Sequence, residues 1–110
     1  KPTRVVMEPI RSGQQIYADN ADLVIMNTVS PGAEVIADGC VHVYGSLRGR
    51  AIAGARGDVQ ARVFCRRMEA ELLAVAGVYA VADQIQGALR GQAVQAYLDN
   101  GTLKIDKLDV

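Results

Sequence analysis

The sequence has few of the residues that usually carry catalysis or metal binding. Its 110 residues include one histidine, two cysteines, four tyrosines, one phenylalanine and no tryptophan. A histidine-based triad would have to be built around His42, and no Gly-x-Ser-x-Gly nucleophile elbow is present. One histidine and two distant cysteines, Cys40 and Cys65, lack the ligand spacing of a metal site. We therefore expect no catalytic residue, no metal and no cofactor.

Net charge and long apolar runs are also missing. Twelve basic residues balance twelve acidic ones, which argues against a nucleic-acid surface because such surfaces need a basic excess. No stretch approaches the roughly 20 apolar residues that span a bilayer, and because no apolar run of the right length follows Lys1 we expect no signal peptide. The chain does not begin with Met, so we expect a fragment of a longer cytoplasmic protein whose two cysteines are reduced rather than paired.

What the sequence does have is a period of six. An α-helix would scatter residues six apart around its axis, because six residues correspond to about 600° of turn. A coil that turns a corner every six residues instead points one aliphatic side chain per side into a shared core. Three such sides make a coil of eighteen, so the pattern predicts an all-β, three-sided solenoid. The residues that carry it are Leu23, Val29, Val35, Val41, Leu47, Ala53 and Val59.

Turn residues support this repeat and show where it changes. Residues 37–39 and 55–57 lie eighteen apart and predict corners, as Asp19-Asn20 does one coil earlier. The glycines between Gly45 and Gly54 also favour corners over a phosphate-binding loop, since the Gly-Lys-Ser/Thr ending is missing. Residues 87–93 repeat residues 45–51 at a distance of forty-two, which predicts coils lengthened to twenty-one residues after Val59.

The chain divides into a short entry and one repetitive unit. Residues 1–8 are interpreted as the end of an inter-domain linker and a first strand, and residues 9–110 as the solenoid. Residues 66–76 contain strong helix formers, but the coil pattern resumes at Val78, so we expect a strand there. Residues 99–101 predict a hairpin turn, followed by a strand over 103–106.

Alternation also predicts an apolar strip on the outside of the solenoid. In residues 41–44 the valines face inward, which places His42 and Tyr44 on the outer surface. Equivalent positions in neighbouring coils are Val24, Met26 and Phe64. Stacked apolar residues of this kind usually mark a partner surface, and a C2 homodimer would make the strip complementary to itself.

Two segments carry a family resemblance. Residues 37–54, from Ala-Asp-Gly-Cys-Val-His-Val-Tyr to Arg-Gly-Arg-Ala-Ile-Ala-Gly, closely resemble the signature of the C-terminal domain of the MinC family, bacterial septum-site inhibitors. Arg11-Ser12-Gly13-Gln14 matches the family's Arg-Ser-Gly-Gln motif. The resemblance runs from about residue 4 to 108, with departures at Arg66-Arg67 and after Gln92.

The resemblance implies a non-enzymatic domain that forms a short right-handed β-helix and dimerises through one sheet. It also implies that Arg11, Ser12, Gly13 and Gln14 bind the ATP-loaded MinD dimer, which recruits the inhibitor to the inner face of the membrane. The C-terminal tail of FtsZ would be a second partner, with Arg48 and Arg50 as candidates for pairing with its carboxylates. The family's N-terminal inhibitory domain would be absent from this chain.

Two other interpretations remain open at this point. Left-handed hexapeptide-repeat acyltransferases, which are trimeric enzymes, also have a six-residue aliphatic period. Against them, the residues after each aliphatic position, such as Ile36, His42 and Arg48, are not consistently small. A purely structural β-helical spacer is the third possibility, and the residues themselves do not fix the hand of the coil.

Overall fold

The computed structural model describes residues 2–109, and nearly all of its regular secondary structure is short strands. Only two short helical turns, α1 (Ala82–Ile85) and the 3₁₀ turn η1 (Gly87–Leu89), interrupt them in the described chain. The strands are β1 (Thr3–Val6), β2 (Gln15–Ala18), β3 (Asp22–Ile25), β4 (Glu34–Ala37), β5 (Val41–Leu47), β6 (Arg50–Ala53), β7 (Val63–Met68), β8 (Leu72–Val75), β9 (Val78–Val81), β10 (Val94–Asp99) and β11 (Thr102–Lys107).

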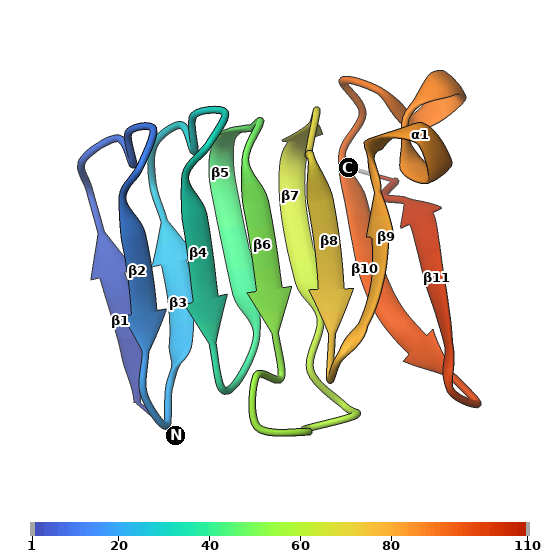
Figure 1. The fold of residues 1–110 in the computed structure, drawn as a ribbon, viewed down its shortest axis with the longest axis horizontal. Coiled ribbons are helices and arrows are strands. Elements are labelled where there is room, and N and C mark those ends of the chain that lie inside the picture. The colour runs from blue at the N-terminus through green and yellow to red at the C-terminus, as the bar shows by residue number, and fades with distance from the viewer. Residues whose placement is uncertain (1, 110) are drawn as a thin grey trace.

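The strands form two sheets that face each other across one core (Figure 1). One sheet has the order β1-β3-β5-β7-β10-β11 and the other β2-β4-β6-β8-β9. From β1 to β8 the chain alternates between the sheets, and each strand pairs in parallel with the strand one coil away. A narrow third side is closed by a ladder of Ile10, Val29, Leu47 and Met68. The predicted three-sided β-helix is therefore confirmed, with the right-handed crossovers that parallel strands favour (Figure 1).

Six of the seven residues in the period of six are fully buried. Leu23, Val29, Val35, Val41, Leu47 and Ala53 all have 0 % exposure, so one aliphatic side chain per side does build the core. Val59 was predicted wrongly, because its side chain is 57 % exposed on the loop between β6 and β7. Leu23 lies opposite Val41 as expected, but Val41 lies opposite Val63. Extra loop residues therefore shift the register in the coil after Ala53.

Corner chemistry explains where the coils turn. Asn20 has a φ of 56° and Gly57 a φ of 101°, as the predicted corners require. Gly45 lies at a corner of a different kind: it is within β5 and needs no positive φ, but a Cβ there would overlap the backbone of Asn27 one coil earlier. The β5–β7 register shifts between Val43 and Ser46, so Gly45 lets β5 bend from one side of the coil to the next.

The C-terminal third closes the solenoid instead of continuing it. Residues 66–76 contain strand, as predicted, but Ala76 and Gly77 both have positive φ and reverse the chain, so β9 runs antiparallel to β8. The prediction that coils resume at Val78 and again at residues 87–93 was therefore wrong. β10 returns to the first sheet, antiparallel to both β7 and β11. The hairpin turn at residues 99–101 is confirmed, with positive φ at Asn100 and Gly101.

Candidate binding surfaces

The predicted binding loop is an exposed turn between β1 and β2. All four of its residues are exposed. Gln14 donates its backbone N–H to the Arg11 carbonyl at 2.9 Å, and its side-chain oxygen accepts the Arg11 backbone N–H at 2.6 Å. Gly13 has a φ of 85°, and a Cβ at that position would meet only open space. The turn is thus held by its own polar groups, which leaves the Arg11 guanidinium and Ser12 hydroxyl on the outside.

The same loop rests on the equivalent turn of the next coil. Gly13 donates its N–H to the Gly32 carbonyl at 3.0 Å. Gly32 has a φ of 80°, and a Cβ there would come within 2.6 Å of Ser12 Oγ. The loop and the Gly32 turn are therefore in close contact, and only glycine fits between them without displacing Ser12.

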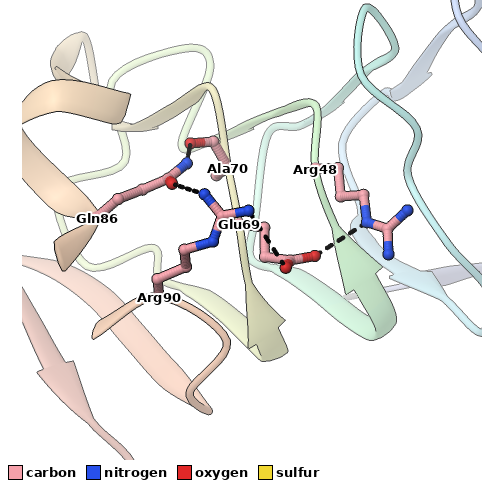
Figure 2. Close-up of polar contacts among 5 residues, drawn as sticks. All are labelled: Arg48, Glu69, Ala70, Gln86 and Arg90. Carbon is pink, nitrogen blue, oxygen red and sulfur yellow. Dashed lines mark hydrogen bonds and ion pairs between the residues drawn. The ribbon is translucent and has the colours of Figure 1, made fainter. Parts of the chain in front are cut away.

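Arg48 and Arg50 lie farther along the same corner of the solenoid. The turns that precede β2, β4, β6 and β8 all lie at one end of the coils, at the top of Figure 1. The Arg48 Nε donates to Glu69 Oε1 at 2.9 Å, and Arg90 approaches the other oxygen of Glu69 at 4.0 Å, from the opposite side (Figure 2). Arg50 lies 4.0 Å from Glu71. The sequence thus brings both predicted partner sites to one corner, but it did not reveal the acidic residues beside the arginines.

These ion pairs determine how the corner can bind an acidic partner. The hydrogen bond from Arg48 lowers the pKa of Glu69, so this carboxylate stays ionised at neutral pH. Arg90 is held in turn by Gln86, whose side-chain oxygen accepts from Arg90 at 3.0 Å (Figure 2). A shallow hollow of about 370 Å³ is lined by Pro31, Arg48, Glu69, Glu71 and Arg90. Any incoming carboxylate would therefore have to replace Glu69 or Glu71 as the partner of an arginine. Both arginine side chains are exposed enough for such an exchange.

The predicted apolar strip lies on the outer face of the first sheet. Val24, His42 and Phe64 are paired in one row across β3, β5 and β7. The His42 ring stacks 4.8 Å from the Phe64 ring and 6.4 Å from the Tyr44 ring, measured between centroids. Burial lowers the pKa of His42, which favours a neutral imidazole at pH 7. Met26 and Tyr44 remain 44 % and 51 % exposed. The five predicted residues therefore share one apolar surface.

A groove adjoins this strip. It has a volume of about 710 Å³, and its lining includes His42, Tyr44 and Phe64. Arg66, Ala93 and Leu108 contribute to the rest of the lining. The strip is thus hollowed rather than flat, which gives it the relief that a complementary surface needs.

The second sheet carries an apolar row that the sequence analysis missed. Its members are directly opposite one another across β2, β4, β6, β8 and β9: Tyr17, Ile36, Ile52, Ala74 and Tyr79. A signal was present, because Ile16-Tyr17 and Val35-Ile36 are continuous apolar pairs where a solvated strand would alternate. Arg50 lies in the neighbouring row, between Glu34 and Leu72. One of the two predicted arginines therefore borders this second apolar face.

The cysteines and the potential metal ligands show no arrangement typical of a reactive site in the described residues. Both cysteines are free, as expected, and burial raises the pKa of Cys65 to about 12, so its thiol is unreactive at neutral pH. Among residues 2–109 no three potential metal ligands gather at one place. Within the same residues, no helix has the length and apolar character needed to cross a membrane.

Comparison with known proteins assigns the fold to a family. The model of the family described as septum formation inhibitor MinC, C-terminal domain, matches residues 4–108. The chain belongs to the MinC C-terminal domain family. A probable septum site-determining protein MinC from Photobacterium profundum is 55 % identical over 98 % of this chain and 49 % of its own length. One from Xylella fastidiosa is 57 % identical over 96 % of this chain and 44 % of its own length.

A solved structure agrees with this assignment. A chain of a MinC:MinD cell division protein complex from Aquifex aeolicus superposes with a TM-score of 0.88 and 29 % sequence identity. The match covers 100 % of this chain and 89 % of that one. The MinC family is one of division regulators and not of enzymes, so the acyltransferase interpretation does not hold. The chain spans about half the length of the curated MinC relatives it matches.

Proposed function

We propose that this chain is the dimerisation and MinD-binding domain of a MinC division inhibitor. It acts in the cytoplasm and reaches the inner face of the membrane only through ATP-bound MinD. Residues 9–110 form the β-helical domain that binds the partners, and residues 1–8 contain the end of a linker and the first strand. The observation that carries this proposal is the similarity of the whole chain to a MinC solved in complex with MinD.

Arg11, Ser12, Gly13 and Gln14 form the MinD-binding loop. Their exposure supports this role, together with a turn whose backbone is held by its own hydrogen bonds. A turn held in this way loses little conformational entropy on binding. Arg11 offers a planar fork of donors for a carboxylate of the partner. Gly13 allows the partner backbone to approach closely, because no atom of this chain lies within 4 Å of its missing Cβ.

The apolar strip of Val24, Met26, His42, Tyr44 and Phe64 is the homodimer interface. Two copies related by a twofold axis would cover the strip and the groove beside it, which otherwise remain exposed to water. The neutral state of His42 suits this role, because an uncharged imidazole is much less costly to bury than a cation.

The FtsZ C-terminal tail binds at the corner that contains Arg48 and Arg50. An extended segment with acidic and apolar side chains fits two features found together there. The arginines supply cationic groups, and the apolar row of the second sheet, which includes Ile52, lies beside Arg50. The arginines already pair with Glu69 and Glu71. The binding free energy from each arginine is therefore only the difference between its contact with a tail carboxylate and its existing contact with a glutamate. We therefore expect weak binding that depends on several contacts together.

Recruitment to vesicles tests the MinD proposal directly. The chain is mixed with MinD and anionic phospholipid vesicles, with either ATP or ADP, and the pellet is analysed after centrifugation. We expect the chain in the pellet only when MinD and ATP are both present. Equal sedimentation with ADP, or without MinD, would contradict recruitment through the ATP-bound partner.

A further inference from the structure

Glu71 is far from the binding loop in sequence, but its side chain is hydrogen-bonded to the Gly32 turn, which contacts that loop. Its Oε1 accepts the backbone N–H of Gly32 at 3.1 Å, across thirty-nine residues of chain. The backbone of Glu71 is itself fixed in the wall of the solenoid, since its N–H donates to the Gly49 carbonyl at 2.8 Å and its carbonyl accepts from Ala82 at 3.0 Å. The carboxylate thus extends from a rigid base to the Gly32 turn.

Gly32 is the residue on which the binding loop rests. Its N–H is held by Glu71, and its carbonyl accepts the N–H of Gly13. A Cβ on Gly32 would come within 2.6 Å of Ser12 Oγ, so a small rotation of this turn would displace the loop above it. Both backbone polar groups of Gly32 are therefore hydrogen-bonded: its carbonyl to the loop, and its N–H to the side chain of Glu71, two coils away.

Glu69 provides a natural comparison on the same corner. Its side chain pairs with Arg48 at 2.9 Å and with Arg90 at 4.0 Å (Figure 2). Glu71 has a weaker cationic neighbour, Arg50 at 4.0 Å, and reaches the Gly32 turn instead. The two carboxylates are two residues apart and equal in charge, but only Glu71 is bonded to the support of the loop.

We propose that Glu71 is a positioning residue for the loop Arg11–Gln14, holding it in the conformation that binds MinD. This inference rests on the proposed function, because it concerns the same binding loop. The carboxylate acts as a hydrogen-bond acceptor for the Gly32 N–H and does not contact the partner. An amide oxygen at the same place can accept the same bond, so Glu71→Gln preserves the loop and Glu71→Ala does not.

The test compares four variants in the vesicle assay with MinD and ATP: Glu71→Ala, Glu71→Gln, Glu69→Ala and Gly13→Asp. We expect Glu71→Ala to weaken the apparent affinity for MinD about three- to tenfold, the range that corresponds to one net hydrogen bond. Glu71→Gln and Glu69→Ala should remain within about twofold of the original chain, a difference too small for one net hydrogen bond.

Amide hydrogen exchange supplies a readout that is independent of the partner. Protection of the Gly32 N–H should fall in Glu71→Ala and persist in Glu71→Gln, while thermal melting shows both to be folded. If Gly13→Asp abolishes recruitment but Glu71→Ala behaves like the original chain, the positioning role is wrong and the MinD proposal stands. If Gly13→Asp also leaves recruitment unchanged, the binding loop itself is wrongly assigned, and the positioning role is refuted with it.

Discussion

Two valines that both fit the six-residue period should lose very different amounts of stability on the same substitution to alanine. Val41 is fully buried in β5, whereas Val59 is 57 % exposed on the loop before β7. Val41→Ala removes two methyl groups from the core, worth about 0.8 kcal/mol each in transfer free energy. The cavity left behind adds to this cost, so we expect a loss of about 1.5–3 kcal/mol in the free energy of unfolding.

Val59→Ala is the matched control. It removes the same two methyl groups from a side chain that water already reaches, and surface changes of this kind usually stay within about 0.5 kcal/mol. The assay is urea unfolding followed by circular dichroism. Both variants are compared at one protein concentration, because the proposed dimerisation would make the apparent stability depend on it. Equal destabilisation by the two substitutions would refute the register shift and put Val59 back in the core.

Two other predictions concern the partner surfaces. Tyr44→Asp places a charge in the middle of the apolar strip and should give a folded monomer by light scattering, because the core is untouched; a dimer that persists at low concentration would place the interface elsewhere. Changing Arg48 and Arg50 together to Glu should lower affinity for an FtsZ tail peptide at least about tenfold by fluorescence anisotropy, since each attraction becomes a repulsion, whereas single alanine changes cost only about 0–1 kcal/mol. Unaltered binding by the double variant would remove these arginines from the tail site.

The fold was predictable from sequence wherever one side chain per side determines the coil. Leu23, Val35 and Leu47 face inward because the wall turns at fixed intervals, and the period records that directly. The period could not tell Val59 from a core residue, because a valine in an inserted loop can fall on the six-residue spacing by chance and looks the same in sequence as a buried valine. The reversal at Ala76 and Gly77 was missed for a similar reason, since a two-residue turn has little pattern of its own.

The exposure of the candidate binding residues was predictable from sequence, but their contacts within the chain were not. The motif Arg11–Gln14 picked out a loop that is exposed, and alternation picked out the outward-facing strip that contains His42 and Tyr44; their binding roles stay predictions. The bond between Glu71 and Gly32, and the pair of Arg48 with Glu69, depend on which coil lies above which. That relation requires the exact register, and the register changes in the loop after Ala53.

Recruitment of Gly13→Asp by MinD and ATP to vesicles tests the central claim most directly. Gly57→Asp is the matched control, because Gly57 also has a positive φ and a Cβ there also meets open space. The loop between β6 and β7, which contains Gly57, lies at the opposite end of the coils from the turn between β1 and β2 (Figure 1). We expect both variants to be folded and dimeric, with Gly57→Asp recruited normally and Gly13→Asp left in solution. Arg11→Ala should weaken recruitment as well, by about 2 kcal/mol or more if the guanidinium is desolvated in the complex. If folded, dimeric Gly13→Asp sediments as well as Gly57→Asp, the loop is only a structural turn and does not bind MinD.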